Sequence, residues 1–361
     1  MIHSMIKSGE ELLDTGGRKV EAHAGAILYE DGRYWLYGED KSHTDGKNKI
    51  WTWGVHCYSS TDLMNWRDEG LIIPPETQDP QSWLHPGRHL DRPHIVHCQA
   101  TGKYVCWLKY SGTTEACFGV LTAERLLGPY AFVRTAFRPF GKEVGDFDLL
   151  EEEGQTYLYF TEGHSGIVAC RLTEDCTDVQ PGYVRYYEHL TVPYVREGVA
   201  LVRHAGRRYL FTSGMTGYIS NPTEVALLDE PMGKITVLGN PHVGDPSGAS
   251  FRSQISTIIP IHGRDNVYLV LADRWIPSLS MNARKTEKMM RALAACMSRD
   301  YRATLMEKAR LAFLPWNCDK VNTSLSRYVW LPMTFEDGMP VIQWQDSWSP
   351  ETWSRKGKSE Q

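Results

Sequence analysis

Long apolar runs are missing from this chain of 361 residues. No stretch approaches the roughly 20 apolar residues that span a bilayer, so the sequence contains no candidate membrane helix. The first residues, MIHSMIKSGEELLD, lack the apolar core of a secretory signal and soon turn acidic. These absences predict a cytoplasmic protein without a membrane partner.

Paired cysteines and basic stripes are missing as well. The eight cysteines form no CxxC pair and no compact framework, so we expect them to be reduced and buried in a core that needs no disulfides. The net charge is -5, and no run of Lys and Arg with interleaved aromatics occurs, which argues against a nucleic-acid partner. Walker, GxGxxG and GxSxG loops are absent, so neither nucleotide binding nor serine-hydrolase chemistry is indicated.

Metal-ligand spacing is also lacking. His94 and His97 stand three residues apart in an expected strand, so their side chains point to opposite faces and make a poor pair of ligands. The acidic run at 151–155 lacks the alternating oxygen ligands of a calcium loop. We therefore expect no metal ion and no cofactor.

What the chain does contain is a repeated apolar β-run anchored on a tyrosine just after a turn. The tyrosines stand 70, 53, 52 and 59 residues apart, at Tyr34, Tyr104, Tyr157, Tyr209 and Tyr268. A strand-rich unit that recurs at such intervals cannot bury both of its faces, so the copies must pack on one another. The pattern predicts an all-β fold, with residues 1–361 forming a single five-bladed β-propeller.

A second regularity accompanies the tyrosines. Eleven to fourteen residues before each tyrosine stands a polar residue, namely His23, Asp91, Asp146, Glu197 and Gln254. The innermost strand of every propeller blade lines the axis, so five equivalent positions converge on one central pocket. Burying three carboxylates, an amide and an imidazole together is costly unless they serve a function. The spacing alone therefore predicts an active site on the axis.

Residues 277–316 interrupt the last repeat. KTEKMMRALAACM and YRATLMEKARLAF carry apolar residues at helical spacing and have almost no β-branched run. They predict a helical hairpin inserted in the last blade. Its role stays open between packing on the outside of the propeller, forming a wall of the pocket, and joining copies of the chain into a homo-oligomer.

Several phrases resemble glycoside hydrolase family 43. In order they are STDLMNW at 60–66, DRPHIV at 91–96, REGVALVRHAGRRYLFTSGMTGY at 196–218, SQISTIIPI at 253–261, DRW at 273–275 and YVWLP at 328–332. AHAGAILY, YGED, TSGMTG and SQISTI are most similar to phrases of the subgroup that contains exo-β-1,3-galactanases. The resemblance implies an exo-acting, inverting hydrolase that releases a terminal sugar from a β-1,3-galactan or a related plant-polysaccharide oligosaccharide.

Other functions stay open at this point. Within the family, an α-L-arabinofuranosidase, a β-xylosidase or a β-galactofuranosidase is an alternative to a β-1,3-galactanase. Outside hydrolysis, a catalytically silent carbohydrate-binding propeller and a glycoside phosphorylase remain. Some relatives hold a calcium ion on the axis, but nothing in this sequence requires one.

The resemblance also assigns catalytic roles. It places the general acid at Glu197 and the carboxylate that orients this acid at Asp146, with Asp148, two residues further on the same strand face, as the alternative. The aspartate that most of the family carries on the first inner strand is replaced here by His23. Asp91 then becomes the candidate base or sugar ligand, and Gln254 the residue that positions water.

Further residues are expected to contact the sugar. Glu39 and Tyr110 match family positions that face the bound sugar, and Thr216 lies on a loop of the fourth blade. Arg92 is either a ligand of sugar hydroxyls or part of a structural ion pair. His23 and Gln254 complete the expected substrate-binding set.

Overall fold

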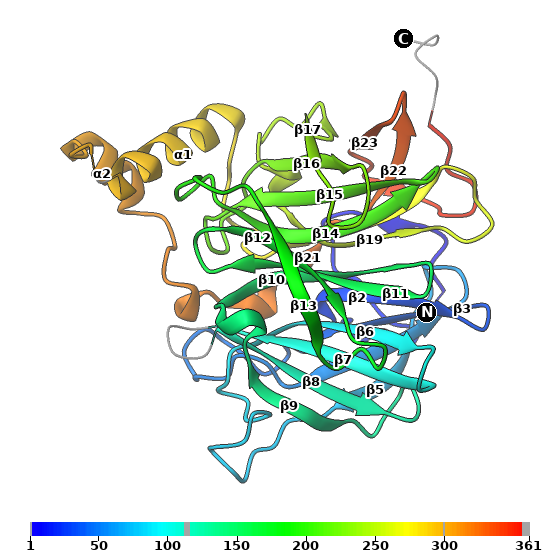
Figure 1. Ribbon diagram of the computed structural model, residues 1–361. Coiled ribbons are helices and arrows are strands. Elements are labelled where there is room, and N and C mark those ends of the chain that lie inside the picture. The colour runs from blue at the N-terminus through cyan, green and yellow to red at the C-terminus, as the bar shows by residue number, and fades with distance from the viewer. Residues whose placement is uncertain (1, 112–115, 299, 356–361) are drawn as a thin grey trace.

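Five sheets of mainly antiparallel strands form the body of the molecule. A computed structural model describes residues 2–111, 116–298 and 300–355, and Figure 1 shows its sheets arranged about one axis. The first two blades consist of β2 (His23–Glu30), β3 (Arg33–Glu39), β4 (Val55–Ser60) and β5 (Arg67–Ile73), then β6 (Leu90–Cys98), β7 (Lys103–Tyr110), β8 (Cys117–Ala123) and β9 (Ala131–Phe137). The next two consist of β10 (Val144–Glu152), β11 (Gln155–Glu162), β12 (Gly166–Leu172) and β13 (Val179–Tyr186), then β14 (Arg196–His204), β15 (Arg207–Gly214), β16 (Thr223–Leu228) and β17 (Ile235–Gly239).

The fifth blade has additional strands. It consists of β19 (Gln254–Pro260), β20 (Tyr268–Arg274), β22 (Leu331–Glu336) and β23 (Met339–Gln343), with β18 (His242–Val243) parallel to β23 and β21 (Arg327–Tyr328) paired with β20. The first strands of all five blades contact one another in a closed ring, from β2 through β6, β10 and β14 to β19 and back to β2. The predicted five-bladed propeller is confirmed.

Four of the five repeated tyrosines form a hydrogen bond to a neighbouring blade. Tyr34 of the first blade accepts a hydrogen bond from the backbone N–H of His262 in the fifth, at 2.9 Å. Tyr209 of the fourth blade donates to the carbonyl of Gly338 in the fifth, at 2.9 Å. Tyr104 donates to Glu30 of the first blade at 2.6 Å. A tyrosine suits this position because its ring is buried while its hydroxyl reaches a polar partner.

A β-bulge follows the start of every innermost strand. The register shifts between His23 and Ala26 in β2, and corresponding shifts occur in β6, β10, β14 and β19. Ala24 and Arg92, which lie in these bulges, have left-handed φ angles of 44°. A bulge bends the strand and re-aims its side chains, so these irregularities direct polar residues toward the axis.

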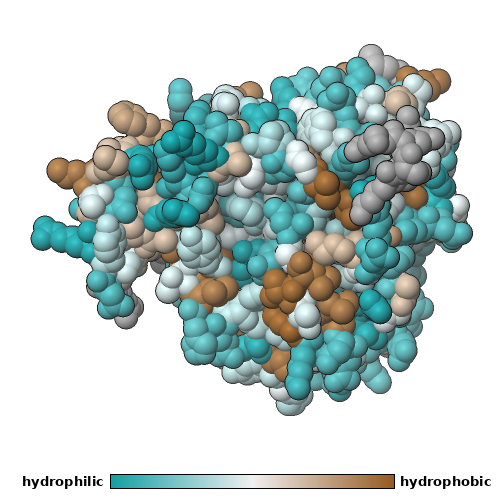
Figure 2. Space-filling model, turned by 90° about the horizontal axis from the view of Figure 1, so that it is seen from above, coloured by the Kyte–Doolittle hydropathy of each residue, from teal (hydrophilic) through white to brown (hydrophobic). Residues whose placement is uncertain are grey.

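Two helices project from the side of the propeller, as predicted (Figure 1). They are α1 (Ala283–Met297) and α2 (Leu305–Leu311), inserted between β20 and β21. α1 packs Met289 and Met290 against Ile219, whereas no residue of α2 is buried. Figure 2 shows hydrophobic side chains on the outer surface of this projection, at the left of the view. The homo-oligomer predicted from this insertion stays a prediction.

Short elements complete the architecture. The part of the chain that the structure describes has four 3₁₀ helices, η1 (Pro139–Gly141), η2 (Ser250–Arg252), η3 (Cys318–Lys320) and η4 (Thr323–Leu325), and β1 (Ile6–Lys7) pairs with β24 (Ser347–Trp348). All eight cysteines lie in the described ranges, and no disulfide joins any two of them; six are buried, whereas Cys296 is exposed and Cys318 partly exposed. Among the described residues, no helix is long and apolar enough to cross a membrane.

Candidate active site

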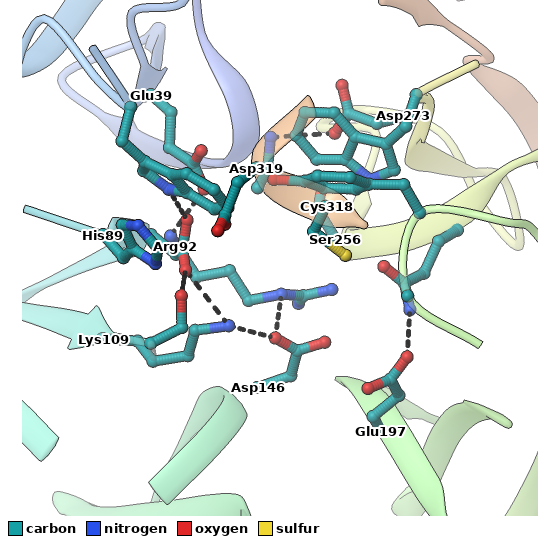
Figure 3. A pocket seen from close by; sticks show the side chains of 18 residues that line it. Glu39, His89, Arg92, Lys109, Asp146, Glu197, Ser256, Asp273, Cys318 and Asp319 are labelled. Carbon is teal, nitrogen blue, oxygen red and sulfur yellow. Dashed lines mark hydrogen bonds and ion pairs between the residues drawn. The ribbon is translucent and has the colours of Figure 1, made fainter. Parts of the chain in front are cut away.

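A cavity of about 440 Å³ lies on the axis, where the innermost strands begin. Every blade contributes to its wall (Figure 3). The lining residues are Ala24, Glu39, Trp51, His89, Asp91, Arg92, Lys109, Ser111, Asp146, Glu197, Gly217, Tyr218, Gln254, Ser256, Asp273, Trp275, Cys318 and Asp319. Six of the nine predicted site residues are thus brought together, namely Glu39, Asp91, Arg92, Asp146, Glu197 and Gln254.

Asp146 lies at the centre of an ionic network. Its Oδ1 is 2.8 Å from Lys109 Nζ and 3.1 Å from Arg92 Nε, and its Oδ2 accepts a hydrogen bond from the backbone N–H of Gly198 at 3.0 Å. Burial alone would raise the pKa of Asp146, but the positive charges of Arg92 and Lys109 outweigh it and hold the pKa well below its ordinary value. Asp146 is therefore ionised throughout the physiological range.

Glu197 has the opposite electrostatic environment. Burial raises the pKa of Glu197 to about 8, and the negative charge of Asp146 adds to the rise. Gln254 Nε2 lies 3.5 Å from Glu197 Oε1 and donates to Ser213 Oγ at 2.9 Å. A protonated carboxyl group, Glu197, thus lies near an ionised one, Asp146. Their environments push the two pKa values apart, so that one group can act as an acid while the other stays charged.

Asp91 is held by three donors. The Trp51 indole donates to its Oδ1 at 2.6 Å and the Ser111 hydroxyl to its Oδ2 at 2.6 Å, while Lys109 Nζ lies 3.4 Å from Oδ2. A carboxylate offers about four acceptor sites, so Asp91 can still accept a hydrogen bond from water or from a sugar hydroxyl. Lys109 joins Asp91 to Asp146 across the cavity floor.

Glu39 forms a buried pair at the first-blade side. Lys41 Nζ lies 2.6 Å from its Oε2, and the backbone N–H of Arg92 donates to its Oε1 at 2.9 Å. Burial raises the pKa of Glu39; the charge of Lys41 opposes this rise and that of Asp91 supports it. Glu39 thereby holds the Arg92 bulge beside the cavity.

The comparison with protein families decides the identity of this propeller. The model of "Glycosyl hydrolases family 43" matches residues 47–244, which is more than half of the chain. The chain belongs to glycoside hydrolase family 43. It is accordingly a glycosidase, and the axial cavity is its candidate active site.

Solved structures share the fold of this family 43 enzyme. A family 43 β-1,3-galactosidase superposes with a TM-score of 0.76 and 24% identity, covering 96% of this chain and 64% of its own. An exo-β-1,3-galactanase from Phanerochaete chrysosporium with galactose superposes with a TM-score of 0.73 and 22% identity, covering 96% of this chain and 68% of its own. An exo-β-1,3-galactanase from Clostridium thermocellum superposes with a TM-score of 0.71 and 23% identity, covering 96% of this chain and 66% of its own. This chain therefore spans about two thirds of the length of these relatives. No curated protein sequence matches it.

His23 does not face the cavity of the family 43 enzyme, which corrects its prediction as a sugar ligand. Its ring is fully buried, with Nδ1 2.8 Å from Asp273 Oδ1 and a stacking distance of 4.7 Å to Tyr328. Asp273 also accepts a hydrogen bond from the backbone N–H of Ala24 at 2.8 Å. The bulge turns the next residue, Ala24, to the cavity and leaves His23 behind the wall.

Tyr110 and Thr216 also lie outside the cavity, contrary to prediction. Tyr110 is fully buried and donates to the carbonyl of Trp83 at 2.8 Å, so the ring packs under the loop that follows β5. Thr216 donates to the carbonyl of Ile219 and accepts from the Asn221 amide at 2.6 Å. Both residues shape loops, and neither is available to a ligand.

Lys109 and Tyr218 are the principal residues that sequence reasoning missed. Lys109 faces Asp91 directly across the β6–β7 hairpin, as Glu39 faces His23 and Asp273 faces Gln254 in their own blades. In these three blades the residue opposite the axial position is polar and lines the cavity. This pairing could have been used to predict Lys109 from the sequence. Tyr218 follows Gly217 in a loop, where no periodicity predicts the direction of a side chain.

Proposed function

We propose that this family 43 enzyme is an exo-acting, inverting glycosidase that releases terminal galactose from β-1,3-linked galactan oligosaccharides. A cavity enclosed by five blades supports the exo mode because it accepts a chain end more readily than an internal segment. The galactose specificity is supported by the activities of the relatives that share its fold, which are a β-1,3-galactosidase and exo-β-1,3-galactanases.

The observation that carries the proposal is the pair formed by Glu197 and Asp146. Inverting hydrolysis requires a carboxyl group that is still protonated at neutral pH, so that it can protonate the leaving oxygen. Glu197, with a pKa raised to about 8, meets this requirement, and ionised Asp146 maintains it. A silent carbohydrate-binding propeller has no need of this arrangement.

The water-activating side of the reaction is assigned to Asp91 and Gln254. Gln254 directs its amide nitrogen to Ser213 and Glu197. Its carbonyl oxygen accepts no hydrogen bond from the described residues, so it can accept one from water. Asp91 retains acceptor capacity for water or for a sugar hydroxyl. Gln254 therefore positions the water, and Asp91 is its base or holds the sugar.

Phosphorolysis is less well supported than hydrolysis. A phosphate would need free cationic groups at the pocket. Arg92 and Lys109, which line it, are both engaged by Asp146. Hydrolysis is consequently the reaction that we propose.

A substrate panel tests this function. It comprises aryl β-galactosides, α-arabinofuranosides, β-galactofuranosides and β-xylosides together with β-1,3-galactobiose and -triose, each with and without phosphate. We expect galactose as the product, appearing first as the α-anomer in proton NMR, with no requirement for phosphate. Preferential cleavage of another glycoside, or β-galactose as the first product, would contradict the proposal.

A further inference from the structure

The mouth of the cavity is closed on one side by the segment that follows the helical insertion. Residues 317–326, here called the strap, include η3 and η4 and pass between a loop of the first blade and a loop of the fourth. A Cβ atom on Gly46 would lie 3.0 Å from the strap backbone, and one on Gly217 would lie 3.1 Å from Cys318 Sγ. Glycine on both sides thus permits close packing and places the strap over the pocket.

The strap approaches the catalytic groups. Cys318 and Asp319 are part of the cavity lining together with Glu197 and Asp91. Burial raises the pKa of the Cys318 thiol, and the negative charge of Glu197 contributes to the rise, as expected for neighbouring groups. A sugar attached to the oxygen that Glu197 protonates must therefore leave the pocket past the strap.

Asp319 is the carboxylate of the strap that faces this exit. It is exposed, and Figure 3 shows it among the side chains that line the cavity. Asp91 and Asp146 are engaged by donors, whereas the Asp319 carboxylate forms no hydrogen bond or ion pair with the described residues. Its acceptor capacity is available to a ligand.

Aromatic rings complete the surroundings of the exit. Trp51 stacks on His89 at 4.0 Å and faces Tyr218 at 6.2 Å, and Tyr218 lies 5.0 Å from Trp275. Rings of this kind offer apolar faces to the C–H surfaces of a sugar, but they do not fix its hydroxyl groups. A carboxylate among them supplies that directional contact.

We propose that Asp319 is a specificity-determining residue for the sugar on the leaving-group side of the cleaved bond. Its carboxylate accepts hydrogen bonds from hydroxyls of that sugar and repels a sugar that carries a carboxylate of its own. The proposal deepens the proposed function and rests on its glycosidase chemistry. The helical insertion thereby has a role in substrate specificity, because the strap that follows it places Asp319 at the pocket.

The test compares substrates with and without a second sugar, using Asp319→Asn and Asp319→Ala. We expect kcat/KM on a neutral disaccharide to fall about tenfold more than on the aryl glycoside of the same terminal sugar, chiefly through KM. Asp319→Ala removes the acceptor of the sugar hydroxyl, and Asp319→Asn replaces a charged acceptor by a weaker neutral one. On a disaccharide whose second sugar bears a carboxylate, Asp319→Asn should raise kcat/KM. Asp265→Asn, an exposed carboxylate in the β19–β20 hairpin, is the matched control and should change neither ratio.

Equal losses on both substrates, or none, would overturn the proposal. The comparison uses whichever terminal sugar the wild-type enzyme cleaves in the panel, so a wrong assignment of galactose leaves the test of Asp319 intact. If the wild-type enzyme cleaves none, calorimetry of disaccharide and monosaccharide binding to wild type and Asp319→Asn replaces the ratio. Unchanged disaccharide affinity in Asp319→Asn would then refute the role.

Discussion

At the scale of single residues, the neighbouring environments of Glu197 and Asp146 set the chemistry. Replacing Glu197 by Gln removes the transferable proton and keeps the shape of the side chain. We expect turnover of β-1,3-galactobiose to fall by about 10²–10⁴-fold, because the leaving sugar needs general acid assistance. The loss should be much smaller for a dinitrophenyl glycoside, whose leaving group needs little protonation. Equal losses in kcat on the two substrates would rule out Glu197 as the acid.

The pH dependence follows from the same pair. Glu197 is active while protonated, so kcat/KM should decline as the pH rises through about 8. Asp146→Asn removes the negative neighbour and leaves Arg92 and Lys109 without their partner, and both changes lower the pKa of Glu197. The alkaline limb of the profile should therefore move to lower pH in this variant. A limb that stays in place would show that another group sets it.

The base is tested at Asp91 and Gln254. If Asp91 activates water, Asp91→Asn should lower kcat on activated and unactivated substrates alike, and azide should partly restore it as an external nucleophile. If Gln254 has this role, Gln254→Glu should be tolerated while Asp91→Asn chiefly raises KM. Steady-state kinetics on both substrate types separate the two outcomes. Unchanged turnover in both variants would place the base elsewhere.

At the scale of structural elements, the bulge at the start of β14 positions the acid. Gly198 has a φ of +64°, and a Cβ there would lie 2.7 Å from Ser213 Oγ and 3.0 Å from Gln254 Nε2. Gly198→Ala should therefore displace Gln254 and lower kcat. It should also lower the free energy of unfolding by roughly 1–2 kcal/mol, because the methyl group strains a left-handed backbone.

Gly206→Ala is the matched control for this bulge. Gly206 has a φ of +74° and no atom within 4 Å of the position of a Cβ. It should show a similar loss in the free energy of unfolding with unchanged kcat. Equal kcat in the two variants would mean that the contact with Gln254 is not needed.

The same scale shows why repeat spacing located some residues at the cavity and failed to do so for others. Asp91, Glu197 and Gln254 begin innermost strands, and repeat spacing sufficed to identify them. His23 occupies the same repeat position, but its bulge presents Ala24 to the cavity and a buried partner, Asp273, holds the imidazole. A bulge shifts side chains by one position without leaving a periodic trace in the sequence.

At the scale of the whole molecule, pairing of β1 with β24 fixes segments from opposite ends of the described chain against the first and fifth blades. Trp348 is fully buried and its indole donates to the carbonyl of Trp330 at 2.9 Å, within the cluster that also contains Trp66. Trp348→Ala should lower the free energy of unfolding by about 3–5 kcal/mol, measured by denaturant titration. Trp353→Ala, which removes a partly buried ring from the same cluster, should cost less. Equal effects of the two substitutions would contradict the greater contribution assigned to the fully buried Trp348 ring.

The sequence by itself determined the blades, the helical insertion and most of the carboxylates on the axis. These features are encoded locally, because strand and helix periodicity and a repeated tyrosine recur in every unit. Only the tertiary structure decided that Lys109 bridges Asp91 and Asp146, that Tyr110 and Thr216 serve loops, and that the strap brings Asp319 to the mouth of the cavity. Such contacts join segments that are far apart in the chain, so they depend on how the blades pack and on where the loops between them come to rest.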